Sequence, residues 1–466
     1  MNVNRLIFPG FWFGKSSRED ALALARRGVG GFCIYGGTLQ SIRELVRDLR
    51  AASPLNHLFI CADYEDGLGK WIPGTSWVLS NLAVGASASE EIAYQKGLTL
   101  AGEARQAEVD WVFAPVLDLC DEPENPIVNT RSFGARPQQV ATLGAALCRG
   151  LTAGGVLNSI KHFPGHGRTT QDSHLGLPIL KRTRRQLQEN ELVPFRAALP
   201  YADSVMAGHL LLPDLDAQHP ASLSRAVITD LLKKEMGFGG LVLTDALCMK
   251  AIGDEKQAAL LALQAGAHIL LAAENSLALS DFLQQQKGLE PFVAASEKLQ
   301  ENLAEKLHAP SLTGLSAADF NARYAAHAAV QQGEKITLNP GQKIAYLEVG
   351  NEENFAAKTF LAALQARGIV IQKYDGNAAS VLVAVSFSNY KAFKGHINLS
   401  QQEQTLLSDA AAHSRKSIFV SFGSPFGTEK INLSARLFCF SPAEEMQICA
   451  ADILCGQQKA QGKWPL

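Results

Sequence analysis

Residues 161–178 gather several side chains that can transfer protons into one polar segment. The segment reads KHFPGHGRTTQDSHLGLP and contains three histidines, a lysine, an arginine and an aspartate. It follows an apolar run, residues 156–160, that has the pattern of a buried strand. Polar side chains of this kind cannot build a core, and loops that follow buried strands often carry function. The segment is therefore predicted to present chemistry at the end of a strand.

The spacing of apolar runs predicts the element that must position this segment. Short apolar runs alternate with helical patterns, and they cover residues 5–8, 32–35, 58–62, 111–116, 157–161, 204–207, 241–244 and 269–271. Eight such strands within about 270 residues predict a (β/α)₈ TIM-like barrel. The alternative is a doubly wound open sheet, which would carry a phosphate-binding glycine turn early in the chain. The glycines of residues 28–37 lack the strand–GxGxxG–helix context and are interpreted as helix-end and turn residues.

Unusual polar residues follow most of the predicted strands. They are residues 63–66, Asp118 with Arg131 beyond it, Lys161 and His162, His209, Asp245, and Glu274 with Asn275. The carboxyl ends of barrel strands converge on one face, where enzymes of this fold keep their active sites. Packing does not explain polar residues at so many strand ends, so their position indicates an enzyme.

A second α/β unit is predicted after the barrel. The barrel is expected to occupy residues 1–310 and a helical linker residues 311–340. From residue 341 the pattern restarts, with about five strands and three helices up to residue 466, which predicts a smaller α/β sandwich domain. No catalytic constellation is evident in this second unit.

Composition excludes several classes of protein. The 466 residues are 47% hydrophobic and carry a formal net charge of -2, without the basic cluster that a nucleic-acid-binding surface needs. No apolar run approaches the roughly 20 residues that span a membrane, and the first residues lack the pattern of a signal peptide. The eight cysteines form no CxxC pair and lie mostly in apolar patterns. Scattered thiols of this kind favour a reducing compartment, and a cytoplasmic location is predicted.

Several motifs together resemble family 3 of the glycoside hydrolases, in its β-N-acetylglucosaminidase branch of the peptidoglycan-recycling type. They are APVLDL (114–119), RSFG (131–134), KHFPGHG (161–167), DSHLGLP (172–178), SVMAGHLLLP (204–213), PASLS (220–224) and GFGGLVLTDALCMKAI (237–252). They occur in the expected order and span most of the predicted barrel. The second unit resembles the α/β sandwich that many family members append.

The resemblance implies roles for three residues in a retaining glycosidase, which needs a nucleophile and an acid/base on opposite faces of the anomeric carbon. Asp245 lies at the end of an apolar strand, where position alone is equally consistent with a helix N-cap and with a nucleophile. Its match to the family's nucleophile motif implies the nucleophile. Asp172 and His174 match the family's acid/base pair. In an extended segment their side chains would point the same way, so that the carboxylate could orient the imidazole.

The resemblance also implies residues that bind the sugar. Lys161 and His162 end a predicted strand and are expected to reach the hydroxyls, and Arg131 is the expected partner of the hydroxyls or the acetamido group. His209 resembles a family position near the site, although a buried structural histidine is equally consistent with it. His166 is interpreted as structural. The histidines lack the HExxH spacing and the fourth ligand of a zinc site, so neither a metal nor another cofactor is expected.

One segment departs from the family pattern. The family reads Asp-x-Glu-Gly-Gly after the third strand, with arginines soon after. In this chain residues 63–71 read DYEDGLGKW, so that Asp63 and Glu65 fit but Asp66 does not, and no arginine follows. Lys70 is the candidate to supply the missing charge, and Trp71 is a candidate to stack on a sugar.

The predicted function is an exo-acting, retaining β-N-acetylglucosaminidase that removes terminal GlcNAc from β-linked saccharides, with muropeptides of cell-wall recycling as the substrates. One alternative is a phosphorylase or another β-glycosidase of the same fold, because a neutral histidine in place of a carboxylate would admit phosphate as the acceptor. An alternative of another class is a non-catalytic sugar-binding protein, which the altered residues 66–71 keep open. The expected partner is a carbohydrate, and the oligomeric state is left open.

Overall fold

Parallel strands form a closed ring in the first part of the chain. The computed structural model describes residues 2–307, 309–350, 357–390 and 394–466. The strands are β1 (Ile7–Phe8), β2 (Gly10–Trp12), β3 (Gly31–Tyr35), β4 (Phe59–Ala62), β5 (Trp111–Val112), β6 (Leu157–Phe163), β7 (Ser204–Ala207), β8 (Leu241–Thr244) and β9 (Leu270–Leu271). Neighbours from β2 to β8 pair in chain order, and β1 pairs with β9.

Two local features close this ring. Pro9, which has no N–H to donate, separates β1 from β2 and lets the same stretch of chain pair with β9 on one side and β3 on the other. A parallel bridge between Leu243 and Ile269 joins β8 to the start of β9. The predicted barrel is thereby confirmed, and every predicted strand overlaps an observed one.

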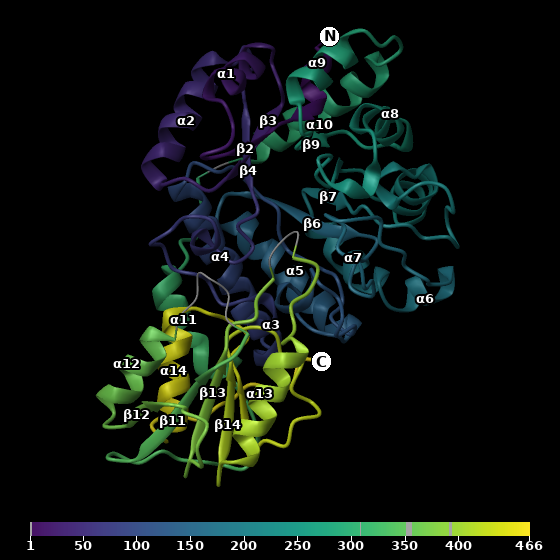
Figure 1. Cartoon of the computed structure of the whole chain (residues 1–466). Coiled ribbons are helices and arrows are strands. Elements are labelled where there is room, and N and C mark those ends of the chain that lie inside the picture. The colour runs from purple at the N-terminus through teal and green to yellow at the C-terminus, as the bar shows by residue number, and fades with distance from the viewer. Residues whose placement is uncertain (1, 308, 351–356, 391–393) are drawn as a thin grey trace.

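Helices surround the barrel (Figure 1). They are α1 (Arg18–Arg26), α2 (Leu39–Ala52), α3 (Asn81–Ser87), α4 (Glu90–Gln106), α5 (Pro137–Ala153), α6 (Arg184–Glu189), α7 (Leu192–Ala198), a π-helix at Ala226–Glu235, α8 (Glu255–Ala265), α9 (Ser276–Gln284) and α10 (Glu290–Lys306). Helix α2 illustrates why they form. Thr38 caps its first turn, and Ile42, Leu45, Val46 and Leu49 recur at helical spacing and are all completely buried.

The barrel interior is filled by side chains from alternate strand positions. Trp111 is fully buried there and meets Phe8, Phe59 and Phe113 edge-on, with ring centroids 5.6–6.1 Å apart. All eight cysteines lie in the described residues, and each is a free thiol. No described helix has the length and apolar character needed to cross a membrane.

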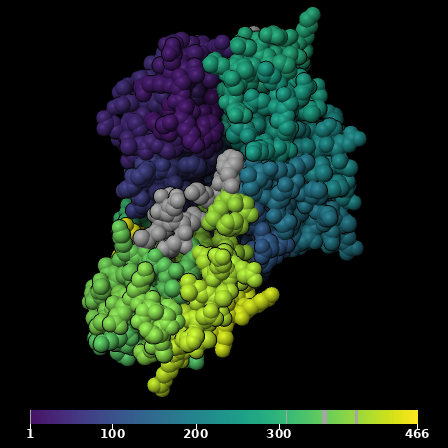
Figure 2. All heavy atoms as spheres, in the orientation of Figure 1, coloured from purple at the N-terminus to yellow at the C-terminus, as the bar shows by residue number. Residues whose placement is uncertain are grey.

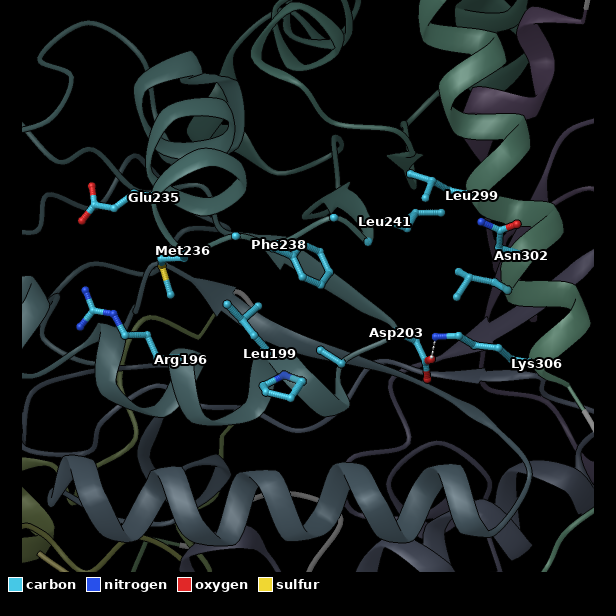
Figure 3. A pocket seen from close by; sticks show the side chains of 16 residues that line it. Arg196, Leu199, Asp203, Glu235, Met236, Phe238, Leu241, Leu299, Asn302 and Lys306 are labelled. Carbon is cyan, nitrogen blue, oxygen red and sulfur yellow. Dashed lines mark hydrogen bonds and ion pairs between the residues drawn. The ribbon is translucent and has the colours of Figure 1, made fainter.

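A pocket of about 700 Å³ lies at the amino-terminal ends of β7 and β8 (Figure 3). Lys306 donates a hydrogen bond to Asp203 across it, with 2.9 Å between Nζ and Oδ1, and Phe238 and Leu241 contribute apolar walls. In barrels this end serves stability, and the reacting groups lie at the opposite end.

The second sheet belongs to the C-terminal domain, which lies below the barrel in Figure 1. Its strands run in the spatial order β10 (Val330–Gly333), β15 (Ala435–Phe438), β14 (Ser417–Ser421), β13 (Leu382–Ser386), β11 (Lys343–Glu348) and β12 (Val370–Lys373), and β10 is antiparallel to β15. The associated helices are α11 (Ala317–Ala328), α12 (Lys358–Ala366), α13 (Gln401–Ala412) and α14 (Glu444–Leu454).

One difference from the sequence prediction concerns this domain. The segment expected to be a helical linker, residues 311–340, contains α11 but also β10, because Val330 and its neighbours pair with β15 at the edge of the sheet. From residue 341 onward, the described residues form five strands and three helices, as the sequence pattern predicted.

Polar and aromatic contacts join the two domains, whose atoms abut in Figure 2. Ser80 donates to the carbonyl of Phe440 (2.7 Å), and Asn398 donates to that of Pro123 (2.8 Å). The last residues return to the barrel, where the N–H of Lys463 donates to the carbonyl of Ala86. The Trp464 ring packs edge-on against Phe438, with centroids 4.9 Å apart. The C-terminal segment therefore connects the domains.

We expect Trp464→Ala to lower the free energy of unfolding by about 2–3 kcal/mol, because it removes a half-buried aromatic side chain and leaves a cavity beside Phe438 and Phe440. Thermal unfolding of the purified protein measures the effect, and Trp464→Phe is the matched control that keeps a ring. An unchanged melting temperature for the alanine variant would contradict the assigned contact.

Candidate active site

A cleft of about 1320 Å³ lies at the carboxyl-terminal ends of the barrel strands. Most of the residues predicted to act in the site line it: Asp63, Lys70, Arg131, Lys161, His162, His174 and Asp245. Asp172 and His209 do not line the cleft. Each forms a hydrogen bond with a residue that does: Asp172 with His174, and His209 with Ala246. The C-terminal domain forms part of the wall with Lys358, Thr359, Tyr390, Pro442, Glu444, Glu445 and Gln447.

Asp245 is held rigidly at the end of β8. Its N–H donates to the carbonyl of Ala207 on β7 (2.9 Å), and its Oδ1 accepts the N–H of Ala246 (2.8 Å). Desolvation raises the pKa of this carboxyl, but His162, His209, the N–H of Ala246 and His174 lower it more, to about 2. Asp245 is therefore ionised at any pH near neutrality, as a nucleophile requires.

His209 does not present its ring to the cleft. The side chain is completely buried, and Ser222 Oγ lies 2.6 Å from Nδ1 while the carbonyl of Ala246 lies 3.0 Å from Nε2. Because a carbonyl only accepts, Nε2 carries the proton and Ser222 donates to Nδ1. The predicted contact with substrate is therefore not available to this ring, and His209 instead supports the backbone next to Asp245.

The Asp172–His174 pair forms, although in a different backbone conformation from the one predicted. Asp172 Oδ1 accepts both the N–H of His174 (2.9 Å) and its ring Nδ1–H (2.7 Å). The N–H groups of Leu175 and Gly176 donate to the carbonyl of Asp172, so the segment is a turn and not an extended strand. Desolvation raises the pKa of Asp172, and the hydrogen bonds from His174 lower it below its usual value. The turn brings carboxylate and imidazole together as effectively as an extended chain would.

Glu65 is the centre of a buried charged cluster at the base of the cleft. Its Oε1 accepts hydrogen bonds from Arg131 Nε (3.0 Å) and Lys70 Nζ (3.1 Å) and lies 4.0 Å from Lys161 Nζ. Lys161 also donates to Asp63 Oδ1 (2.6 Å). Burial raises the pKa of Glu65, but the three cations lower it well below its usual value. Glu65 was not among the predicted site residues, and its match to the family's Asp-x-Glu pattern was the signal that could have identified it.

Asp118 positions one histidine at the end of β6, His162, and one that follows the strand, His166. Its Oδ2 accepts the Nδ1–H of His162 (2.7 Å), and its Oδ1 accepts the backbone N–H of His166 (2.6 Å). With Nδ1 as the donor, Nε2 of His162 faces Arg131 Nη2 at 3.5 Å as an acceptor. His166 is completely buried beside Thr169, and burial lowers its pKa to about 4. Among the described residues, no group of three or more histidine, cysteine or acidic side chains is arranged to hold a metal.

The C-terminal domain contributes an aromatic side chain to the charged cluster. The guanidinium of Arg131 lies over the ring of Tyr390 at 4.6 Å from its centroid, and Lys70 Nζ lies at 5.1 Å. Both distances are within the range of a cation–π interaction. Sequence reasoning found no functional residue in this domain, because a single tyrosine after a strand carries no signal of its partner 259 positions away in the chain (390 − 131).

Comparison with known proteins identifies the family. The N-terminal domain of glycosyl hydrolase family 3 matches residues 2–307, which is most of the chain. The chain belongs to glycosyl hydrolase family 3. The resemblance noted from the motifs is thereby confirmed, and the protein is a glycoside hydrolase.

Curated relatives and solved structures support the assignment. A β-hexosaminidase of Thiobacillus denitrificans is 32% identical over 324 residues, which cover 66% of this chain and 88% of that protein. A β-hexosaminidase of Neisseria meningitidis serogroup B is 34% identical over 277 residues, covering 56% of this chain and 75% of that protein. A family 3 β-N-acetylglucosaminidase structure from Paenibacillus is 26% identical, with a TM-score of 0.87, over 100% of this chain and 98% of that one. A β-glucoside phosphorylase, 21% identical, has the same fold with a TM-score of 0.89 over 100% of this chain and 92% of that one.

The departure from the family 3 pattern after β4 has a structural explanation. Asp66 turns away from the cleft and accepts a hydrogen bond from Lys96 on α4, whose Nζ lies 3.2 Å from Oδ1 and 2.7 Å from Asn81 Oδ1. Lys70 donates a hydrogen bond to Glu65 and so supplies the positive charge that the missing arginine would have carried. Trp71 donates from its indole N–H to the carbonyl of Asp63 (2.9 Å) and meets Tyr35 edge-on at 5.2 Å. The added carboxylate thus has a buried lysine as its partner and does not enter the sugar site.

Lys96→Met is expected to lower the free energy of unfolding by about 3 kcal/mol, because it leaves the Asp66 carboxylate buried without its cation. Adding Asp66→Asn removes that charge and should recover a large part of the loss. Denaturant unfolding followed by tryptophan fluorescence measures both changes. If the double variant is as unstable as Lys96→Met alone, the two side chains are not coupled.

Proposed function

We propose that this family 3 enzyme is an exo-acting, retaining β-N-acetylglucosaminidase that acts through a covalent glycosyl-enzyme. The observation that carries the proposal is the Asp172–His174 hydrogen bond of 2.7 Å on the wall of the cleft that also holds the ionised Asp245. A carboxylate nucleophile and an oriented imidazole are the two groups that retaining hydrolysis requires. The names of the relatives support a β-linked N-acetylhexosamine as the sugar.

In the first step, Asp245 attacks the anomeric carbon while His174 gives its Nε2 proton to the glycosidic oxygen. The bond to the aglycone breaks, and the sugar becomes an ester of Asp245. Asp172 accepts the Nδ1–H throughout, which fixes the tautomer and stabilises the imidazolium before it delivers its proton. In the second step, His174 takes a proton from water as the water attacks the ester, and the sugar leaves with its original configuration.

The charged cluster suits the recognition of a terminal sugar. Lys161 and Asp63 form an ion pair at the base of the cleft, and Arg131 and His162 lie beside it. These four side chains offer donors and an acceptor to sugar hydroxyls and to the acetamido group. Because they are held by Glu65 and Asp118 before substrate arrives, little reorganisation is needed on binding.

The natural substrates are proposed to be muropeptides that carry a terminal GlcNAc, with the cytoplasm as the site of action. The free thiols of all eight cysteines support a reducing compartment.

The direct test of the substrate is a panel of aryl β-glycosides of GlcNAc, GalNAc, glucose and xylose, followed by a GlcNAc-terminated muropeptide and chitobiose. Each is assayed with and without phosphate. Formation of GlcNAc 1-phosphate as the product would show that the reaction is phosphorolysis and not hydrolysis. Equal or faster turnover of the glucoside would contradict the proposed sugar.

Asp245→Ala is expected to lower kcat on 4-nitrophenyl β-GlcNAc by about 10⁴-fold or more, because no ester intermediate can form. Wild-type protein treated with a 5-fluoro N-acetylglucosaminyl fluoride should gain one sugar mass on the peptide that contains Asp245. Labelling of another residue, or full activity of the variant, would remove Asp245 as the nucleophile. Circular dichroism verifies that the variant is folded.

His174→Ala is expected to leave kcat/KM nearly unchanged for substrates with good leaving groups and to lower it by about 10²–10⁴-fold for poor ones, since only the latter need a proton in the first step. For the good substrate the second step becomes limiting, because His174 no longer activates water. Azide should therefore raise kcat for this substrate and yield a β-glycosyl azide, because the small anion replaces water in the second step. Asp172→Asn should show the same pattern more weakly. Equal losses for all leaving groups would show that His174 is not the acid.

A further inference from the structure

The loop that carries the Asp172–His174 pair is anchored at both stems. Asn125 Nδ2 donates to the carbonyls of His166 (3.0 Å) and Thr169 (2.8 Å) on the first stem. On the second stem, Leu180 and Pro178 exchange backbone hydrogen bonds with Leu211. The residues of the tip that are exposed include Gln171 and Leu175. The position of the acid/base therefore depends on how the stems are held.

Glu191 lies between the two stems. It immediately precedes α7 and is 2% exposed. Its Oε1 is 3.5 Å from Arg168 Nη1 on the first stem and 3.3 Å from Arg182 Nε on the second. The dyad lies between these two arginines in the chain. One carboxylate on a barrel helix thus contacts both sides of the loop that carries the dyad.

The turn after β6 packs against the same side chain. Gly165 has a φ of +126°, and a Cβ at this position would lie 3.0 Å from Cβ and 3.1 Å from Cγ of Glu191. A larger residue would push the turn and the carboxylate apart, so this contact requires glycine. Glu191 therefore packs against Gly165 at the start of the loop and forms ion pairs with Arg168 and Arg182 on its two stems.

Burial of this carboxylate is costly unless its charge is compensated. Removing a carboxylate from water costs several kcal/mol, and the attraction of nearby cations must offset that cost. Burial raises the pKa of Glu191, while Arg168 acts to lower it and Asp121, which pairs with Arg168, acts to raise it. The net effect is a raised pKa, so the two arginines, which lie within ion-pair distance but form no hydrogen bond with either carboxylate oxygen, offset the burial only in part. Both cations come from the loop, so this partial compensation also holds the loop.

We propose that Glu191 is a positioning residue for catalysis: through Arg168 and Arg182 it fixes both stems of the loop and so sets where His174 meets the glycosidic oxygen. This inference rests on the proposed function, in which His174 is the acid/base. Glu191 does not touch the cleft, and its effect passes through the loop. A displacement of the imidazole by about 1 Å is enough to impair proton transfer.

The test compares wild type and Glu191→Gln on aryl β-GlcNAc substrates whose leaving groups range from dinitrophenol to phenol. We expect kcat/KM, which reports the first step, to fall by about 10–100-fold for the poor leaving groups and by less than about 3-fold for the good ones, because only the former depend on the acid. Arg182→Met, which removes one of the two contacts, should give a smaller change of the same kind. This second variant keeps the test valid if Glu191→Gln is poorly folded.

Combination with His174→Ala separates this inference from the proposed function. If Glu191 acts through His174, Glu191→Gln adds no further loss on poor leaving groups in the His174→Ala background. If His174→Ala itself shows no dependence on the leaving group, the proposed acid/base is wrong. If His174→Ala behaves as expected but Glu191→Gln slows all substrates equally, or adds its full effect to the double variant, Glu191 is structural and the inference is overturned.

Glu189→Gln is the matched control. Glu189 is an exposed glutamate on α6 that pairs with Arg185 at 2.7 Å, and both partners lie outside the loop. The same change of charge at Glu189 should leave unchanged the way in which kcat/KM depends on the leaving group. A shift equal to that of Glu191→Gln would show that the effect comes from net charge and would overturn the inference.

Discussion

A carboxylate removed from water must have its charge compensated, and the compensation of Glu65 determines the geometry of the cleft. Arg131 from the loop after β5, Lys161 from β6 and Lys70 from the loop after β4 all turn toward this one side chain, which is 2% exposed. Moving any one of the three cations would remove part of the positive charge that compensates the buried Glu65 carboxylate. Arg131 and Lys161, which line the cleft, are therefore held in place before any ligand binds.

The same principle operates twice more around the reacting groups. Asp118, completely buried, accepts from both His162 and His166 and so connects β5 to the start of the catalytic loop. Glu191 forms ion pairs with two arginines of that loop from the opposite side, and these offset its burial in part. Asp245 needs no such cation, because the imidazoles and the N–H of Ala246 keep it ionised. The proposed nucleophile is thus at the end of a barrel strand, and the proposed acid/base is on a loop whose stems carry ion pairs. The C-terminal domain adds Tyr390 to the first cluster, so the two domains share one site.

Local patterns were sufficient for the fold and for the residues on the strands. Alternation of apolar runs and helical stretches predicted the barrel, since strand and helix periods depend on neighbouring residues. Asp63, Lys161, His162 and Asp245, which line the cleft, were singled out because each lies at the end of a buried strand. Residues with distant partners were missed or left open. Glu65 and Glu191 carry no local sign of their cations. The sequence was equally consistent with His209 near the sugar and with a buried structural histidine, and the structure places its ring nitrogen at the carbonyl of Ala246. The departure at Asp66 was explained only by its partner Lys96 on α4.

The sequence by itself determined the identities of the chemical groups, the order of the strands and the motif that resembles family 3. Those properties depend on residue type and short spacing, which a chain carries before it folds. Only the tertiary structure decided which charges pair, which histidines face the cleft, that the dyad sits in a turn and that Tyr390 approaches Arg131. These are contacts between segments far apart in the chain, and their energies depend on burial, which exists only once the barrel and the second domain have packed together.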